Sequence, residues 1–194
     1  MKKHIATLGI IAAFIAGPAN AALDRETVAA IGHEVALQMV DSARTLNLIE
    51  WKVGDTANYD VSALFGKVGT MVKTVDREEG EAIWVKSSMD LMGQKQVVEM
   101  LINRADAKVL KMIQNGKEVE VPNDPLEVIS QDYAEITVPA GKFKTIHIVA
   151  KSAKVKKIEV WANPQETVME GSIKQIVSAQ IEVKMELTSF KKIQ

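Results

Sequence analysis

Residues Gln180–Thr188 read QIEVKMELT, an alternation of apolar and polar side chains. Successive side chains of a β-strand point to opposite faces, so the four apolar residues of this run would share one face. A slip of one residue in the pairing would expose all four to water, which makes the register of such a strand strongly specified. The run therefore predicts a β-strand with one buried and one solvated face. The buried residues would be Ile181, Val183, Met185 and Leu187.

The same two-residue alternation continues through the chain from Ile49 onward, in short runs separated by turn-forming residues. Asn115-Gly116 is the clearest turn, because Asn-Gly supplies the positive φ angles of a type I′ hairpin. Residues 172–179 are ambiguous, since Ile173, Ile176 and Val177 would share a helix face, and only the neighbouring strands favour a strand there. The other expected strands are 82–91, 95–103, 108–114, 117–121 and 143–149.

Residues 24–44 differ, because their apolar residues recur at the spacing of an amphipathic helix that Asp24 can cap. We divide the chain into residues 1–21, an N-terminal helical segment at 22–48, and an antiparallel β domain at 49–194 that forms one structural unit with the helix. A large antiparallel sheet tends to curl, because twist accumulates and open edges are a liability. We predict a mainly β (α+β) fold, with the helix packed on a strongly curved antiparallel sheet or incomplete β-barrel of about nine to ten strands.

Residues 1–21 have the pattern of a cleavable secretory signal peptide. Lys2 and Lys3 precede an apolar run at 5–16, and Ala19-Asn20-Ala21 places small residues at the cleavage spacing. The apolar run is shorter than the roughly 20 residues that span a bilayer. No second long apolar segment follows. We expect a periplasmic protein, or one secreted further, that is not a transmembrane protein after cleavage.

Composition excludes several functional classes. Lys and Arg (24) nearly balance Asp and Glu (25), so there is no electrostatic footprint for nucleic acid. The chain has no cysteine, which excludes disulfides, thiol catalysis and a lipid anchor on cysteine. Established catalytic and nucleotide-binding motifs are also missing from the sequence. We therefore expect no enzyme activity, no metal and no cofactor.

Two histidines remain after cleavage as possible bases of a hydrolase: His33, which we interpret as a partly exposed surface residue of the helix, and His147, which lies within an expected strand. A role as a ligand or proton switch is one interpretation of His147. The favoured interpretation is a half-buried histidine that hydrogen-bonds a neighbour. A hydrolase would require a serine or carboxylate beside His147 in an open cleft.

Methionines and tryptophans in the expected strands are the candidate ligand-binding residues. Methionine adapts to apolar partners of variable shape, and indoles can line the mouth of an apolar cavity. The alternative is plain packing, because unbranched methionine also fills irregular gaps in a core. The candidate set is Trp84, Met89, Met100, Met112, Trp161 and Met185.

Three short motifs resemble a family of uncharacterised exported bacterial β-proteins. Residues 137–145 read TVPAGKFKT and match that family's V-P-A-G-x-F element, followed in order by VWANP at 160–164 and MELTSF at 185–190. WKVGD at 51–55 is similar to the family's opening strand. At the level of fold, the chain is similar to periplasmic lipoprotein carriers of the LolA and LolB type, in which a helix plugs an incomplete barrel. LolB-type proteins are lipidated on a cysteine that this chain lacks.

Three functions are compatible with these patterns. The first is a carrier or sensor that binds an apolar ligand, such as a lipid or acyl chain, in a curved sheet covered by the helix. The second is an envelope protein that presents a sheet edge or face to another protein and binds no ligand. The third, a hydrolase, is disfavoured because its motifs are missing.

Overall fold

The structure is a computed structural model that describes residues 51–194 except 64–65, 122–126, 153–154 and 179–181. The predicted signal peptide and the predicted helix at 24–44 lie outside the described residues. The described part of the chain folds into strands and turns and contains no helix. Its strands are β1 (Thr56–Ala63), β2 (Gly66–Glu79), β3 (Ala82–Leu91), β4 (Gln94–Asn103), β5 (Val109–Gln114), β6 (Lys117–Val119), β7 (Glu127–Val138), β8 (Gly141–Lys151), β9 (Lys157–Ala162), β10 (Ser172–Ser178) and β11 (Glu182–Lys191).

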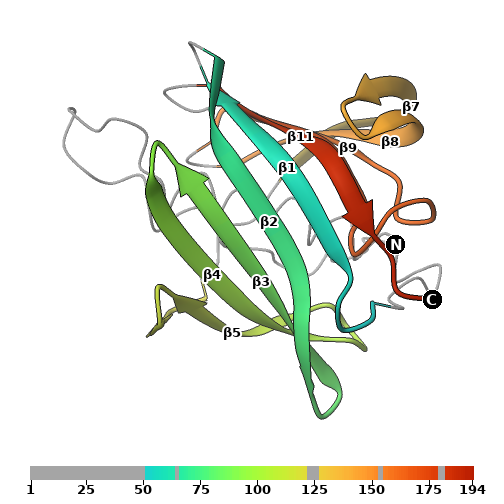
Figure 1. Cartoon of the computed structure of the whole chain (residues 1–194). Coiled ribbons are helices and arrows are strands. Elements are labelled where there is room, and N and C mark those ends of the chain that lie inside the picture. The colour runs from blue at the N-terminus through green and yellow to red at the C-terminus, as the bar shows by residue number, and fades with distance from the viewer. Residues whose placement is uncertain (1–50, 64–65, 122–126, 153–154, 179–181) are drawn as a thin grey trace.

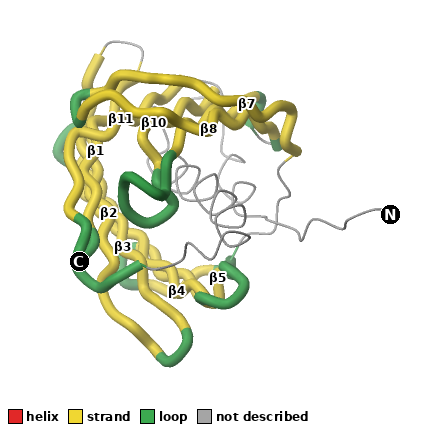
Figure 2. Tube along the Cα trace, turned by 90° about the vertical axis from the view of Figure 1, so that its right-hand side faces the viewer, coloured by secondary structure: helices red, strands yellow, loops and turns green. Residues whose placement is uncertain are grey.

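All eleven strands form one antiparallel sheet in the order β6-β5-β4-β3-β2-β1-β11-β10-β9-β8-β7. Two series of hairpins, β1 to β6 and β7 to β11, are joined by the pairing of β1 with β11. The sheet bends into an open arc, with β5 and β7 on opposite sides of the enclosed space (Figure 1, Figure 2). The predicted curvature and the absence of closure into a complete barrel are confirmed, but the sheet has eleven strands where about nine to ten were expected.

The expected strands agree closely with the observed ones. The Asn115-Gly116 turn has φ angles of 48° and 80°, as a type I′ hairpin requires. The ambiguous segment at 172–179 is strand β10, and its pairing with β9 shifts between Ser172 and Lys174. The buried positions of β10 do alternate, at Ile173, Gln175 and Val177, but the middle one is polar, which is why the apolar residues alone did not show the strand pattern. In β11 the predicted inward residues Val183, Met185 and Leu187 are buried, which confirms the register of that strand; Ile181 lies outside the described residues.

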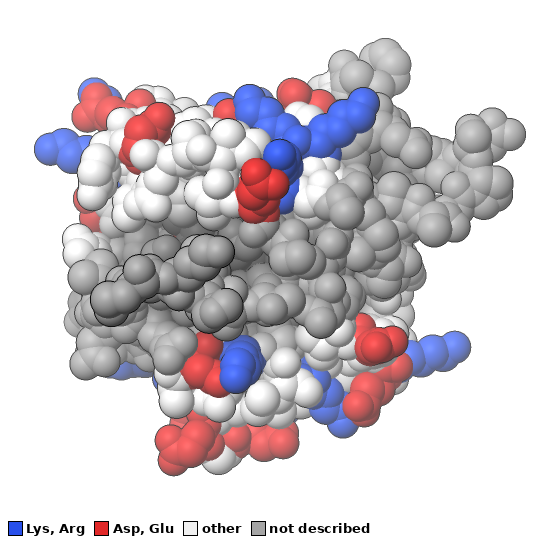
Figure 3. Space-filling view, turned by 180° about the vertical axis from the view of Figure 1, so that it is seen from behind, with Lys and Arg blue, Asp and Glu red and all other residues white. Residues whose placement is uncertain are grey.

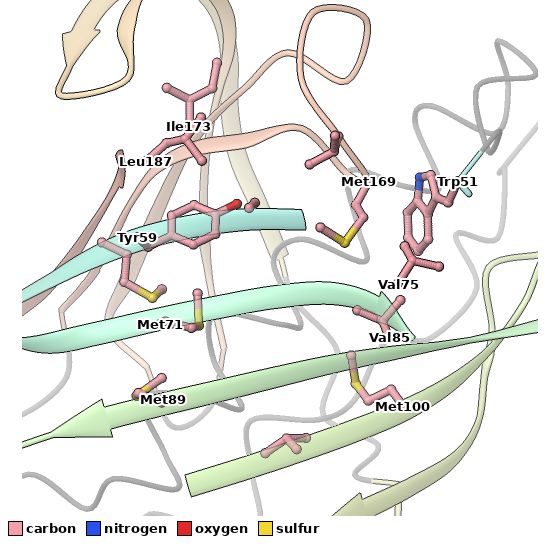
Figure 4. Packing of buried hydrophobic residues seen from close by; sticks show 14 of the residues in the cluster. Trp51, Tyr59, Met71, Val75, Val85, Met89, Met100, Met169, Ile173 and Leu187 are labelled. Atoms are coloured by element: carbon pink, nitrogen blue, oxygen red, sulfur yellow. The ribbon is translucent and has the colours of Figure 1, made fainter. Parts of the chain in front are cut away.

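One face of the sheet carries the main hydrophobic cluster, and we call it the concave face. Buried residues of β1 to β5, β10 and β11 meet there, together with Val168 and Met169 from the loop between β9 and β10 (Figure 4). A second cluster continues over β8, β9 and β10. The opposite, convex face carries a smaller cluster of Ala82, Trp84 and Leu101. The sheet is a single layer in the described region. Its concave face carries the two larger clusters and its convex face the smaller one.

Candidate functional site

Apolar side chains form continuous rows across the concave face. One row crosses four strands, pairing Met112 with Met100, Met100 with Val85, and Val85 with Val75. A second row pairs Met89 with Met71, Met71 with Tyr59, and Tyr59 with Leu187. Directly opposed residues of an antiparallel pair lie on the same face, so these rows make a broad apolar surface. Six methionines belong to the cluster: Met71, Met89, Met100, Met112, Met169 and Met185.

The structure separates the predicted ligand-binding residues into two groups. Met89, Met100, Met112 and Met185 are buried together on the concave face. Trp84 lies on the convex face, where its Nε1 donates a hydrogen bond to Glu79 Oε2 at 2.8 Å. The six residues therefore do not surround one site.

Trp161 also lies on the convex face, opposite His147 of β8. Its ring stacks on the His147 imidazole at 4.3 Å between centroids, and Lys174 Nζ lies 5.2 Å from the ring centroid. Trp51, which was not among the predicted residues, is the tryptophan that joins the concave cluster, close to Val75 (Figure 4).

A buried ion pair between Lys73 and Glu170 lies within this apolar face. Lys73 follows Met71 and precedes Val75 at inward positions of β2, and its side chain is 3% exposed. The Glu170 side chain, 4% exposed, comes from the loop between β9 and β10. Neither residue was predicted as part of a site from the sequence. A signal existed for Lys73, because it occupies an apolar position of the alternating pattern, but none indicated its partner.

The loop at 163–171 has a conformation that places Glu170 on the sheet. It projects into the space enclosed by the arc (Figure 2). Asn163 Oδ1 accepts hydrogen bonds from the backbone N–H groups of Gln165 and Glu166 at 3.1 and 3.0 Å. Met169 has a φ of 53° and Gly171 a φ of 74°. A Cβ at Gly171 would lie 2.2 Å from the backbone nitrogen of Pro164, so only glycine fits there.

Tyr59 completes the buried polar group. Its hydroxyl donates a hydrogen bond to the Ser172 carbonyl at 3.0 Å, and Lys73 Nζ lies 5.9 Å from its ring centroid. Burial raises the pKa of Tyr59 well above its ordinary value, the negative charge of Glu170 raises it further, and these two effects outweigh the smaller, opposite effect of the Ser172 side chain. Tyr59 is therefore held in its neutral form.

His147 lies between two carboxylates on the convex side. Its Nδ1 is 3.1 Å from Asp132 Oδ1, and its Nε2 is 3.4 Å from Glu159 Oε2. This confirms the interpretation of a half-buried histidine that contacts neighbouring polar groups. The 3.4 Å contact is within ion-pair range but does not satisfy hydrogen-bond geometry. The expectation that the protein is not an enzyme stays a prediction.

An open groove of about 670 Å³ lies beside the outermost strand β7. Its lining comes from Tyr133, Ala134 and Glu135 of β7, from residues 144–146 of β8, and from residues 162–165. Tyr133 is 87% exposed, and Val128 and Ile129 on the same strand are also exposed. On the face drawn in Figure 3, the acidic and basic side chains of the described residues are interspersed, without a large block of one sign.

Two further observations concern the described residues alone. They contain no group of three or more histidine, cysteine, aspartate or glutamate side chains arranged to hold a metal ion. They also include no helix of the length and apolar character needed to cross a membrane.

Comparison with known proteins shows the fold and little more. No family model matches the chain, and no curated protein matches it in sequence. Among solved structures, the hypothetical protein CT021 from Chlamydia trachomatis has a TM-score of 0.51 and 10% sequence identity, over 81% of this chain and 92% of that one. The chain therefore shares its β fold with that protein. At this identity the likeness carries no information about activity.

Two other structures are less similar. BF2203 from Bacteroides fragilis, a protein with a YmcC-like fold, has a TM-score of 0.40 and 12% identity over 73% of this chain and 97% of that chain. MucB has a TM-score of 0.41 and 10% identity over 80% of this chain and 59% of that chain. The resemblances to the V-P-A-G-x-F family and to LolA and LolB carriers stay predictions.

Proposed function

We propose that this chain is an exported periplasmic protein that binds an apolar ligand, a lipid or acyl chain, on the concave face of its sheet. The observation that carries the proposal is the methionine-rich apolar surface of an open, curved sheet. Six of the nine methionines of the chain share this surface. Methionine is flexible and polarizable, so a surface rich in it can adapt to chains of different length and shape.

The polar groups among the apolar residues of that surface also support the proposal. Ligand sites are concave, mostly apolar, and contain a few polar groups at fixed places. The concave face has this composition, because the Lys73–Glu170 pair and Tyr59 are set among apolar residues. The periplasmic location rests on the signal-peptide pattern of residues 1–21.

The proposal is tested by native mass spectrometry and lipid extraction of protein purified from its own periplasm. We expect a lipid to remain bound. Met100→Gln should reduce the bound fraction, because it places an amide on the concave face. Met92→Gln is the matched control, since Met92 is 61% exposed. Protein free of lipid, or lipid retained equally by both variants, would contradict the proposal.

A second function, docking of another envelope protein without a ligand, is favoured by strand β7. Among the described strands, none pairs with its outer edge. An extended segment of a partner could add to such an edge through backbone hydrogen bonds. A photo-crosslinker at position 133 should then capture a partner in living cells, whereas one at the exposed Leu110 should not. This outcome with lipid-free protein would favour the second function.

A further inference from the structure

A row of residues that includes Lys73, Ser87 and Gln114 crosses the apolar concave face between the two methionine rows, and we call it the polar row. The strand pairing aligns Ala57 with Lys73, Lys73 with Ser87, Ser87 with Val98, and Val98 with Gln114. Lys73, Ser87 and Gln114 are all buried. Polar groups at the centre of an apolar surface cost free energy unless they are paired, so their presence requires an explanation.

Ser87 is the member of the row whose hydrogen bonding is incomplete. Its Oγ is buried and has no hydrogen-bond partner in the structure. Ser87 is directly opposite Lys73, and such residues have Cβ atoms about 4.5–5.5 Å apart, so the two side chains leave the sheet as neighbours on the same face. A buried hydroxyl without a partner is unusual in a native fold. An oxygen atom of a ligand bound to Lys73 would supply the missing acceptor.

Glu170 reaches Lys73 from a loop and not from a neighbouring strand. The loop holds Glu170 between two residues with positive φ, Met169 and Gly171. The sheet itself therefore provides the cation and the hydroxyl, while the carboxylate comes from a separate segment placed over them. A carboxylate of a ligand has the same charge and shape as that of Glu170 and could take its place.

We propose that the ligand is an anionic amphiphile, a long-chain carboxylate, whose headgroup replaces the Glu170 carboxylate on Lys73 and accepts a hydrogen bond from Ser87. Its chain lies along the apolar surface of the methionine rows, which flank the polar row. The exchange moves Glu170, which belongs to the loop at 163–171 and not to the sheet, out to water, so that Lys73 stays paired and no buried carboxylate is left without a partner. A neutral ligand leaves the Glu170 contact in place. This inference rests on the proposed function of the concave face.

The test compares cis-parinaric acid, a fluorescent long-chain carboxylate, with its neutral methyl ester. Both are titrated into the purified protein and three variants. Glu170→Gln removes the competing carboxylate, and Ser87→Ala removes the hydroxyl. The double variant Lys73→Met with Glu170→Gln removes both charges without leaving an unpaired one, and it serves as the folded reference. Circular dichroism and thermal melting check that each variant is folded.

We expect the parent protein to bind the acid about tenfold more tightly than the ester, because the acid keeps Lys73 paired and gains a charge-assisted hydrogen bond from Ser87. Glu170→Gln should tighten binding of the acid, and Ser87→Ala should weaken it several-fold. The double variant should bind both probes with the affinity of the parent for the ester.

Equal binding of acid and ester by the parent would overturn the headgroup inference, as would an undiminished preference for the acid in the folded double variant. Either result leaves the proposed function intact. Failure of every variant to bind either probe would instead contradict the proposed function itself.

Discussion

At the scale of single residues, the concave face contains a buried ion pair, Lys73–Glu170, among its apolar side chains. Both groups are almost completely buried, so each compensates the charge of the other in a region without much water. Part of this arrangement could be predicted from the sequence, because Lys73 occupies the same alternating positions as Met71 and Val75. Its partner is 97 residues away and belongs to a loop, so local patterns contain no information about the pair.

Removing Lys73 alone should be far more damaging than removing both charges. We expect Lys73→Met to lower the free energy of unfolding by about 3–5 kcal/mol, because it leaves the Glu170 carboxylate buried and unpaired. The Lys73→Met and Glu170→Gln double variant should recover most of that loss. Urea unfolding of the parent, both single variants and the double variant measures the coupling. Additive effects would show that the two side chains do not interact.

Tyr59 should resist ionisation while the protein is folded. Its folded pKa is raised, so its contribution to stability is present below the unfolded value of about 10 and is lost as pH rises from there towards the folded pKa. The chain has two tyrosines, so Tyr133→Phe leaves Tyr59 as the only one.

In the Tyr133→Phe variant, tyrosinate absorbance should appear at the same pH as alkaline unfolding, which is monitored by circular dichroism. The same variant in guanidinium chloride should ionise near pH 10. Complete ionisation near pH 10 in a protein that retains its native spectrum would contradict the burial of Tyr59.

At the scale of elements, strands with one buried face were predictable and the loop at 163–171 was not. Strand β3 matches its prediction at both ends, because Ile83, Val85 and Met89 alternate with polar or outward residues. The loop depends on two positive φ angles and on the close approach of Gly171 to Pro164. Contacts of this kind between backbone segments leave no periodic signal in a sequence.

The register of β11 gives a direct test of strand burial. Met185→Lys should lower the free energy of unfolding by about 3 kcal/mol or more, since it places an unpaired charge on the concave face. Lys184→Met, on the opposite face, should change it by less than about 1 kcal/mol, because the ion pair of Lys184 with Glu186 is partly exposed. Similar chemical denaturation midpoints for the two variants would mean that the register is wrong.

Substituting Gly80 and Gly171 by alanine distinguishes the cost of backbone strain from the cost of steric overlap. Both have positive φ, but a Cβ at Gly80 meets no atom within 4 Å, whereas one at Gly171 would overlap Pro164. Gly80→Ala should cost about 1 kcal/mol, the penalty of the left-handed conformation. Gly171→Ala should cost at least about 2 kcal/mol more by thermal unfolding. Equal costs would indicate that the loop relaxes freely.

At the scale of the whole molecule, the sequence indicates a curved antiparallel sheet but not which of its faces is concave. Alternation along β3 already separates Trp84 from Met89, so the two could not line the same surface. Assigning the methionines to the inside and Trp84 and Trp161 to the outside needs the pairing of β1 with β11, which joins residues 130 positions apart. That pairing is a property of the folded sheet and not of any segment.

Tryptophan quenching by a brominated fatty acid tests most directly whether the ligand lies on the concave face. A variant with Trp84→Phe and Trp161→Phe retains only Trp51, on the concave side, whereas one with Trp51→Phe and Trp84→Phe retains only Trp161, on the convex side. The bound chain should quench Trp51 strongly and leave Trp161 nearly unchanged, because bromine quenches only at short range. Quenching of Trp161 equal to or greater than that of Trp51 would contradict binding on the concave face.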